Sequence, residues 1–307
     1  MRITNLMMTQ NAISYMNDNV ERINSLNDKI ASTKQFQTMS DDPTRAASAL
    51  SLRSTLQTNR NYIDNDATVA NWLDANELAL KQMLDVGTTA STLLVQGAND
   101  TLGQTERASL ATSIDGMLTQ AVDLANSKHM DKYIFAGWNT NSATAPFQID
   151  TTTDPAPPAV PTYRMKVNNT VDTHPIQVNI SPGQTLTTNF NGDTVFKDFF
   201  TGLIQAREAL KQNDSTLIQN SMQALQKAMD LIGTASTTNG ARMRQLSQTT
   251  DTMTRTKTQI MSLLSEKEDV NMAEAISMLK GQENTYQAVL AVSQRATSLP
   301  GLFDRMR

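Results

Sequence analysis

The sequence has no cysteine in 307 residues, and this absence excludes disulfide bonds, thiolate metal sites and thiol nucleophiles. Aromatic residues make up 5% of the chain, so the composition favours long helices packed along aliphatic seams over a compact aromatic core. No run of about 18 apolar residues is present, which argues against a membrane span. Residues 1–11 do not build the apolar core of a secretory signal, so we expect no cleaved signal peptide.

The chain also lacks a strong charge of either sign. Its formal net charge is -4 and no block of lysine and arginine stands out, which argues against nucleic-acid binding. His129 and His174 are the only histidines and lie far apart in the sequence, so we expect no metal site. Carboxylates are neighbours at Asp41–Asp42 and at Asp64 and Asp66; we interpret the first pair as a helix start and the second as a solvated helix face. Phosphate-binding loops and nucleophile elbows are missing too, so we predict neither an enzyme nor a cofactor.

Regular steps of three, four and seven between apolar residues predict two amphipathic helices in the first third of the chain. The first covers about residues 6–30 and ends near Gln37. The second begins at Pro43, with Asp42 as its N-cap, and continues without proline to Gly97. About 50 residues at 1.5 Å each give a rod of roughly 75 Å. Its seam residues are Ala49, Leu52, Leu56, Ile63, Ala67, Ala70, Leu73, Leu80 and Leu84.

The character of the chain changes after a third predicted helix, whose seam lies between Ala111 and Ala125. Residues 132–138 are rich in strand formers, and residues 140–161 are crowded with threonine, serine, asparagine and proline, so we place a domain boundary there. Apolar residues alternate with other residues at 163–167 and 176–180, which predicts the strands of a small β domain.

Helices return after this insert. A seven-residue register from Ile218 to Ile260 predicts a second long helix, with a kink allowed near Gly233 and Gly240. Asn239 fills the one vacant position of that seam, where a polar residue can fix the register of packing.

The last helix opens at Asn271, where Glu274 three residues later resembles a capping box. The order of elements is then nearly mirror-symmetric about the insert, so the two long helices bury their seams most simply by lying antiparallel. We predict a mainly α fold with a small β domain: long antiparallel helical rods, coiled-coil terminal helices and an inserted distal β domain. The predicted parts are a terminal coiled coil of residues 1–40 plus 270–307, a helical rod domain of residues 41–146 plus 200–269, and the inserted β domain of residues 147–199.

The terminal helices have too little apolar surface to be stable alone. Six seam side chains contribute at most roughly 10–18 kcal/mol of transfer free energy, whereas ordering about 35 residues costs about 1–2 kcal/mol each. We therefore expect both ends to order when neighbouring subunits cover them. The predicted assembly interface consists of Leu6, Ile13, Met16, Val20, Ile23, Ile30, Met272, Ile276, Leu279, Tyr286, Val289 and Leu290.

Several segments resemble the flagellar hook-associated protein 3 family in order and spacing. They cover about residues 1–147 and 200–307, and no motif in residues 148–199 matches. The matching segments are Ser40–Pro43, Glu106–Thr112, Leu124–Asn126, Tyr133–Trp138, Pro146–Phe147, Asp269–Ser277 and Tyr286–Leu290.

The resemblance implies a structural adaptor of the bacterial flagellum, located outside the cell and exported unfolded through the flagellar type III apparatus. It implies a ring of identical subunits between hook-associated protein 1 and flagellin, and a cytoplasmic export chaperone that holds the C-terminal helix before secretion. It implies neither a nucleic-acid nor a membrane partner.

Two other readings remain open. A flagellin-type filament subunit shares the logic of the terminal coil, although Pro43 and the segment Tyr133–Trp138 argue against it. The seven-residue repeats alone also allow a cytoplasmic coiled-coil scaffold, which we expect to form parallel dimers with an ordered N-terminal helix.

Overall fold

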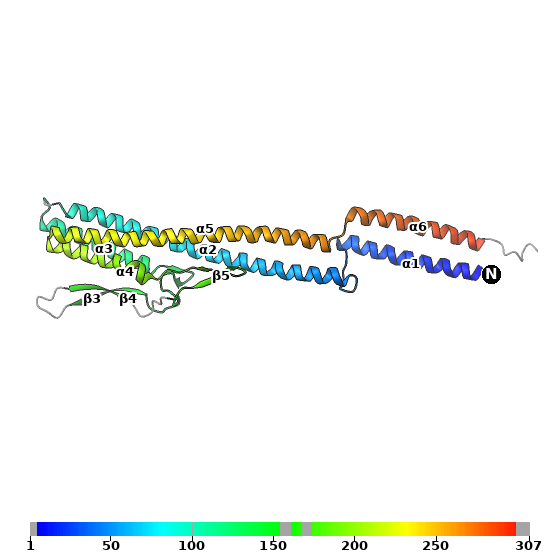
Figure 1. The fold of residues 1–307 in the computed structure, drawn as a ribbon, viewed down its shortest axis with the longest axis horizontal. Coiled ribbons are helices and arrows are strands. Elements are labelled where there is room, and N and C mark those ends of the chain that lie inside the picture. Colours follow the sequence, from blue (N-terminus) through cyan, green and yellow to red (C-terminus); the bar gives the residue numbers. More distant parts are fainter. Residues whose placement is uncertain (1–4, 100, 154–160, 168–173, 299–307) are drawn as a thin grey trace, which may run out of the picture. The chain divides into compact units, whose positions relative to one another are not determined.

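The computed structural model describes residues 5–99, 101–153, 161–167 and 174–298 (Figure 1). The chain forms two compact units. The terminal unit comprises Met1–Thr58 with Thr256–Arg307, and the central unit comprises Asn59–Arg255. The long helices α2 (Pro43–Gly97) and α5 (Ser215–Glu268) contribute residues to both. The predicted division into three parts stays a prediction.

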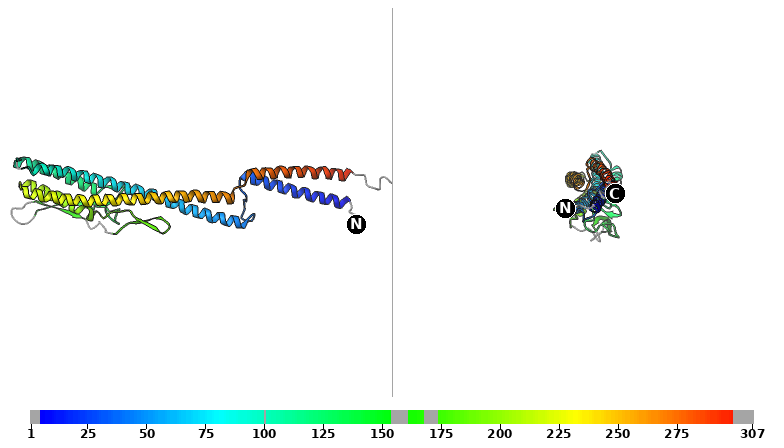
Figure 2. Two further views of the ribbon diagram at one scale, coloured as in Figure 1. Left: turned by 45° about the horizontal axis from the view of Figure 1, so that its top comes forward. Right: turned by 90° about the vertical axis from the view of Figure 1, so that its right-hand side faces the viewer.

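In the terminal unit, α1 (Asn5–Ser32) and α6 (Met272–Ser298) lie side by side and antiparallel, as both views of the ribbon show (Figures 1 and 2). The predicted start of α2 is confirmed, because Asp42 Oδ1 accepts a hydrogen bond from the Arg45 amide at 3.0 Å. Asp41 instead caps the preceding loop by accepting from the amides of Gln37 and Thr38. The first carboxylate pair is thus used for local backbone hydrogen bonds.

In the central unit, α2 and α5 pack with α3 (Gln104–Ala125) and α4 (Gly192–Gln212) around one core. In this core the predicted seams of α2 and α5 are confirmed, because seam residues of both helices are fully buried. The fully buried seam residues are Leu73, Leu80, Ile218, Leu225 and Ile232. Asn239 is buried as well and donates to the Leu73 carbonyl at 2.9 Å, which fixes the register of α2 against α5. The kink that the sequence allowed does not interrupt α5.

A compact aromatic core differs from the expectation drawn from composition. Edge-on or tilted ring contacts, with centroids 4.7 to 6.4 Å apart, join five of the eight phenylalanines. They are Phe135, Phe147, Phe196, Phe199 and Phe200. A low overall aromatic content did not reveal this core because the few rings are concentrated in one place.

Among the described residues, three antiparallel strand pairs accompany the helices. The short pair is β1 (Lys128–His129) with β2 (Lys132–Tyr133), and the long pair is β3 (Phe147–Thr153) with β4 (Pro161–Val167). The third pair is β5 (Gln177–Ser181) with β6 (Gln184–Thr187), joined through Gly183 at a φ of 79°. This pair packs on α2 and α5, since Ile180 and Leu186 share a cluster with Leu73. The prediction of a mainly α fold with small β elements is confirmed.

Two features of this region were not read from the sequence pattern. Strand β3 begins at Phe147, the first residue of the predicted insert, and Asn126 anchors it by exchanging two hydrogen bonds with the Phe147 backbone. Helix α4 begins at Gly192, within the range predicted for the insert, because the Asn191 side chain accepts from the Asp193 amide. In the parts of the chain that the structure describes, every helix is too short or too polar to cross a bilayer.

Candidate assembly surface

One side of α1 faces α6. Residues at steps of three and four have the lowest exposure along α1: Met16, Asn19, Ile23, Leu26 and Ile30. Asn19 is 8% exposed and its Oδ1 accepts a hydrogen bond from Gln282 Nε2 on α6, which identifies this side as the contact between the two helices. The centre of the contact is therefore a polar pair.

The predicted seam of α1 divides into two groups. Met16, Ile23 and Ile30 are half-buried on the side that faces α6. Ile13 is 51% exposed and Val20 is also exposed, so these two point away from the contact. The side chain of Leu6 lies outside the described residues.

The predicted seam of α6 divides in the same way. Its half-buried members are Leu279, Tyr286, Val289 and Leu290. Met272 and Ile276 are exposed, as are Met278 and Val292, which the sequence reading did not select. The structure thus brings together only part of the predicted interface in one chain, and the role of these residues in assembly stays a prediction.

Sequence reasoning missed the polar and small residues of this contact. Asn19 and Leu26 continue the spacing of Met16 and Ile23 on α1, and Gln282 continues that of Leu279 on α6. A search for apolar residues alone does not select an asparagine or a glutamine. Ala275, the most buried residue of α6, is too small to stand out. Spacing without an apolar filter would have found all four.

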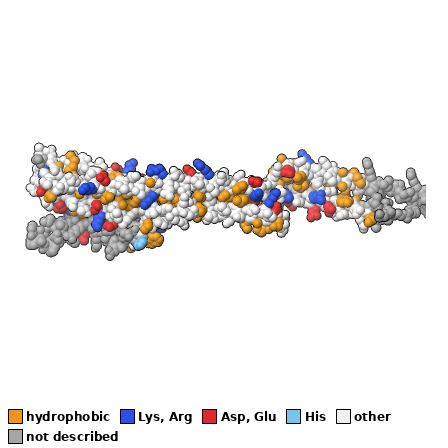
Figure 3. Space-filling model, in the orientation of Figure 1, with side chains coloured by type: hydrophobic (Ala, Val, Ile, Leu, Met, Phe, Trp, Pro, Cys, Tyr) orange, Lys and Arg blue, Asp and Glu red, His pale blue; other side chains and the backbone are white. Residues whose placement is uncertain are grey.

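The α1 and α6 pair has almost no core of its own. Among its described side chains, Asn19 and Ala275 are the residues that are more than nine-tenths buried. Figure 3 shows hydrophobic side chains at the surface of this helix pair. The large exposed ones are Met7, Ile13, Tyr15 and Val20 on α1 and Met272, Ile276, Met278 and Val292 on α6. Such a concentration of exposed apolar side chains is typical of a protein interaction site.

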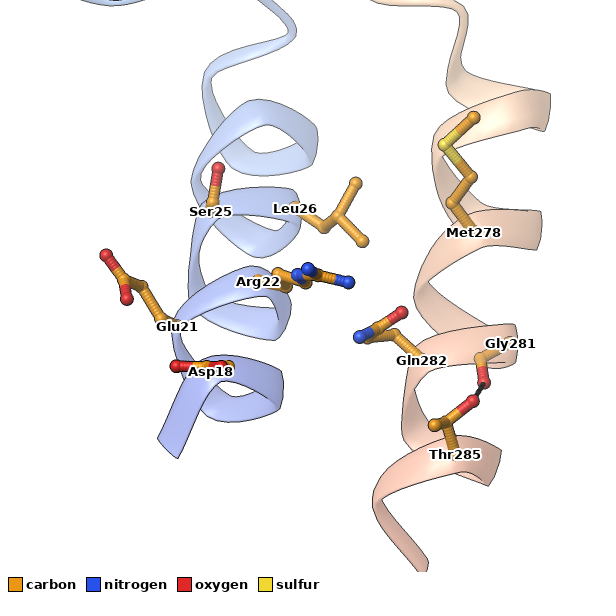
Figure 4. A pocket seen from close by; sticks show the side chains of 9 residues that line it. All are labelled: Asp18, Glu21, Arg22, Ser25, Leu26, Met278, Gly281, Gln282 and Thr285. Carbon is orange, nitrogen blue, oxygen red and sulfur yellow. Dashed lines mark hydrogen bonds between the residues drawn. The ribbon is translucent and has the colours of Figure 1, made fainter. Parts of the chain in front are cut away.

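A groove of about 820 Å³ runs between the two helices (Figure 4). Arg22 and Leu26 of α1 and Gln282 of α6 point into the space between the helices, whereas Glu21 points away from it. A Cβ atom at Gly281 would meet no atom within 4 Å, so the groove is open at its α6 wall. Charged, amide and hydroxyl side chains line the groove together with Leu26 and Met278, and its open shape suits a protein segment.

The residues considered for catalysis or metal binding occupy other places. Asp64 is exposed, but Asp66 is 1% exposed and accepts a hydrogen bond from the Thr250 hydroxyl, so our reading of Asp66 as a solvated residue was wrong. His129 packs edge-on against Trp72 and His174 is exposed. The described part of the chain holds no cluster of three metal-ligating side chains.

Comparison with known proteins finds relatives for part of the chain. Residues 3–140 match the family model of the bacterial flagellin N-terminal helical region. Over 144 residues the chain is 31% identical to flagellar hook-associated protein 3 of Salmonella typhimurium strain LT2, a match that covers 47% of this chain and 45% of the relative. Over 145 residues it is 32% identical to the protein of the same name from Escherichia coli strain K12, with the same two coverages. The chain thus spans less than half the length of each curated relative.

A solved structure extends the likeness to the fold. Flagellar hook-associated protein 3 from Legionella pneumophila superposes with a TM-score of 0.61 at 12% identity, over 70% of this chain and 97% of that one. The chain therefore has the fold of bacterial flagellar hook-associated proteins. Within that class it resembles flagellar hook-associated protein 3, the name that both curated relatives carry, and the resemblance read from its motifs is confirmed.

Proposed function

We propose that this chain is a structural subunit of the bacterial flagellum that joins the hook to the filament and assembles through α1 and α6. The observation that carries the proposal is the composition of this helix pair, which buries almost no apolar side chain of its own and exposes eight large ones. Association that covers those side chains supplies the missing burial, at roughly 25 cal/mol per Å² of apolar surface. The likeness to flagellar hook-associated protein 3 supports the location.

The proposed partners follow from that location. The subunit contacts further copies of itself in a ring, hook-associated protein 1 on one side and flagellin on the other. A cytoplasmic chaperone holds the C-terminal helix before export, and the chain leaves the cell through the flagellar type III apparatus. The proposal requires no catalytic residue, cofactor, nucleic acid or membrane.

Deletion of the gene in the native bacterium tests the role. We expect hooks without filaments and flagellin shed into the medium, both visible by electron microscopy and immunoblotting. Re-expression of the chain should restore filaments, re-expression of Ile276→Asp should not, and the neighbouring exposed change Ser277→Asp serves as the matched control. Normal filaments in the deletion strain would exclude a role at the junction.

A flagellin-type filament subunit is the second candidate, and the match to the flagellin N-terminal helical region favours it. The two functions differ in what the purified chain does alone. A filament subunit should form long polymers on seeds of sheared flagella, whereas a junction subunit should add a short cap that does not elongate. Negative-stain electron microscopy of seeded reactions separates them.

A further inference from the structure

The two connectors of the terminal unit meet and pair antiparallel at one point, which we call the crossing. Residues 33–42 link α1 to α2, and residues 269–271 link α5 to α6. At the crossing the Gln35 amide donates to the Glu268 carbonyl at 2.7 Å, and the Val270 amide donates to the Thr33 carbonyl at 3.0 Å. Lys34 and Asp269 form an isolated antiparallel bridge between these bonds. Two backbone bonds alone make a weak joint, because a short pairing of strands is marginal in water.

A buried carboxylate ties three segments together at this joint. Glu268, the last residue of α5, is 3% exposed. Its Oε2 accepts from Lys34 Nζ of the first connector at 3.3 Å and from Arg53 Nη2 of α2 at 2.7 Å. Lys34 also donates to Asp269 Oδ1 at 2.7 Å, so the same lysine holds the end of α5 and the first residue of the second connector.

Two cations compensate the charge of Glu268. Its other oxygen, Oε1, is buried and has no hydrogen-bond partner among the described residues. A buried carboxylate is costly unless it is well paired, so removing either cation leaves its charge less completely compensated. The hydrogen bond to Asp269 is the main reason that the pKa of Lys34 lies above its usual value, and the same bond lowers the pKa of Asp269.

The packing around the crossing is open in two places. A cavity of about 330 Å³ lies beside Arg53 and Glu268, and a second of the same volume lies beside Gln35 and Asp269. Ala46 and Ala49 of α2 are buried beside the first cavity, and the ion pairs and the two backbone bonds are the polar contacts that resist opening of the joint.

We propose that Glu268 is a clamp that fixes the two connectors to each other, and that α1 and α6 hold a set angle to the first turns of α2 only while this clamp is closed. Neutralising Glu268 converts the crossing into a hinge. The clamp follows from contacts inside the terminal unit and stands whether or not the junction function is correct.

Hydrogen exchange of the full chain, followed by mass spectrometry, tests the clamp. In Glu268→Gln, which keeps the size of the side chain and removes its charge, peptides that contain the amides of Gln35 and Val270 should exchange at least about tenfold faster. Arg53→Met should have the same effect on the same peptides. Glu266→Gln, two residues away and exposed, is the matched control and should leave them unchanged.

Distances measure the hinge directly. Because the chain has no cysteine, Ala31→Cys and Ser54→Cys introduce the only thiols for a pair of spin labels, both at exposed positions of the terminal unit. A narrow distance distribution should broaden when Glu268→Gln is added. Unchanged exchange and an unchanged distribution in both Glu268→Gln and Arg53→Met would overturn the clamp. Faster exchange that extends equally into the central unit would also overturn it, because Glu268 would then support the whole fold.

Discussion

The terminal and central units differ in how many of their hydrophobic side chains are buried. Among the described residues, the buried hydrophobic side chains of the terminal unit are Ala46, Ala49, Leu56, Ile260 and Ala275, whereas the central unit has 35 of them. Of the 18 large hydrophobic side chains that are exposed, 12 belong to the terminal unit. Both units are built from amphipathic helices, so periodicity does not distinguish them. The number of helices that share a core does. In the central unit α2, α3, α4 and α5 close a core, whereas α1 and α6 of the terminal unit pair with each other and leave half of each apolar stripe uncovered.

A core substitution in the central unit should have the largest effect on stability. Phe196 is fully buried and its ring contacts those of Phe135, Phe147 and Phe200. We expect Phe196→Ala to lower the free energy of unfolding by about 3–5 kcal/mol, because it leaves a cavity among these rings. Urea unfolding followed by circular dichroism measures the loss, with the exposed Leu78→Ala as control. A loss below 1 kcal/mol would contradict the closed aromatic core.

Arg107 should have the next largest effect. Its Nη1 donates to the carbonyl and side-chain oxygens of Asn213, and its Nη2 donates to the Asn99 carbonyl at 3.1 Å. We expect Arg107→Met to cost about 1–3 kcal/mol, since it removes the hydrogen bonds of a charged guanidinium group that is only 4% exposed. The same unfolding assay measures it, and Arg244→Met, on α5, serves as a control of equal charge. An equal effect of the two changes would show that the contacts of Arg107 are dispensable.

Asp66 should give the central unit a smaller, pH-dependent effect. Burial raises the pKa of this carboxyl above its usual 3.8, outweighing the hydrogen bond from Thr250. A raised pKa in the folded state means that stability is fully present below the unfolded pKa and is lost as pH rises through the folded pKa. Asp66→Asn should therefore unfold at a higher urea concentration than the parent at pH 7, and the difference should disappear below about pH 3.8. A constant difference from pH 3 to pH 7 would show that the carboxyl does not titrate as its burial requires.

The smallest effect on monomer stability should come from the exposed stripe of the terminal unit. We expect Ile13→Ser to change the free energy of unfolding by no more than about 0.5 kcal/mol, because its side chain already contacts water. The same change should nevertheless reduce junction formation in a complemented deletion strain, scored by filament counts in electron micrographs. Asn17→Ser, exposed on the same helix, should do neither. Normal filament counts with Ile13→Ser would remove this residue from the proposed interface.

The sequence predicted the parts of the fold that depend on repetition and local chemistry. The seam through Leu73 and Leu80, the cap at Asp42 and the polar register residue Asn239 all follow from spacing and from the preferences of single residue types. The burial of Asp66 was not predicted. Its spacing fits the buried seam of α2, but its charge favours a solvent-exposed position. Its burial depends on a threonine 184 positions away.

The candidate surface was predicted less completely than the fold. Ile13 and Ile23 have the same chemical character, and their different exposure is decided by the orientation of α1 against α6. Tertiary packing sets that orientation through Asn19 and Gln282, which a hydrophobic pattern does not register. An apolar stripe in the sequence therefore predicts that a helix packs against another surface. The structure is needed to show which residues of the stripe contact the same chain and which stay exposed.

The position of Arg107 also has a mechanical consequence. One guanidinium group bridges the turn after α2, at Asn99, and the turn between α4 and α5, at Asn213. Under tension that draws these two turns apart, the bond to Asn99 and the bonds to Asn213 lie in series, so the whole load passes through this one side chain and the weaker side gives way first. We expect the peak unfolding force of the central unit, in single-molecule pulling along that direction, to fall with Arg107→Met and to stay unchanged with Arg244→Met.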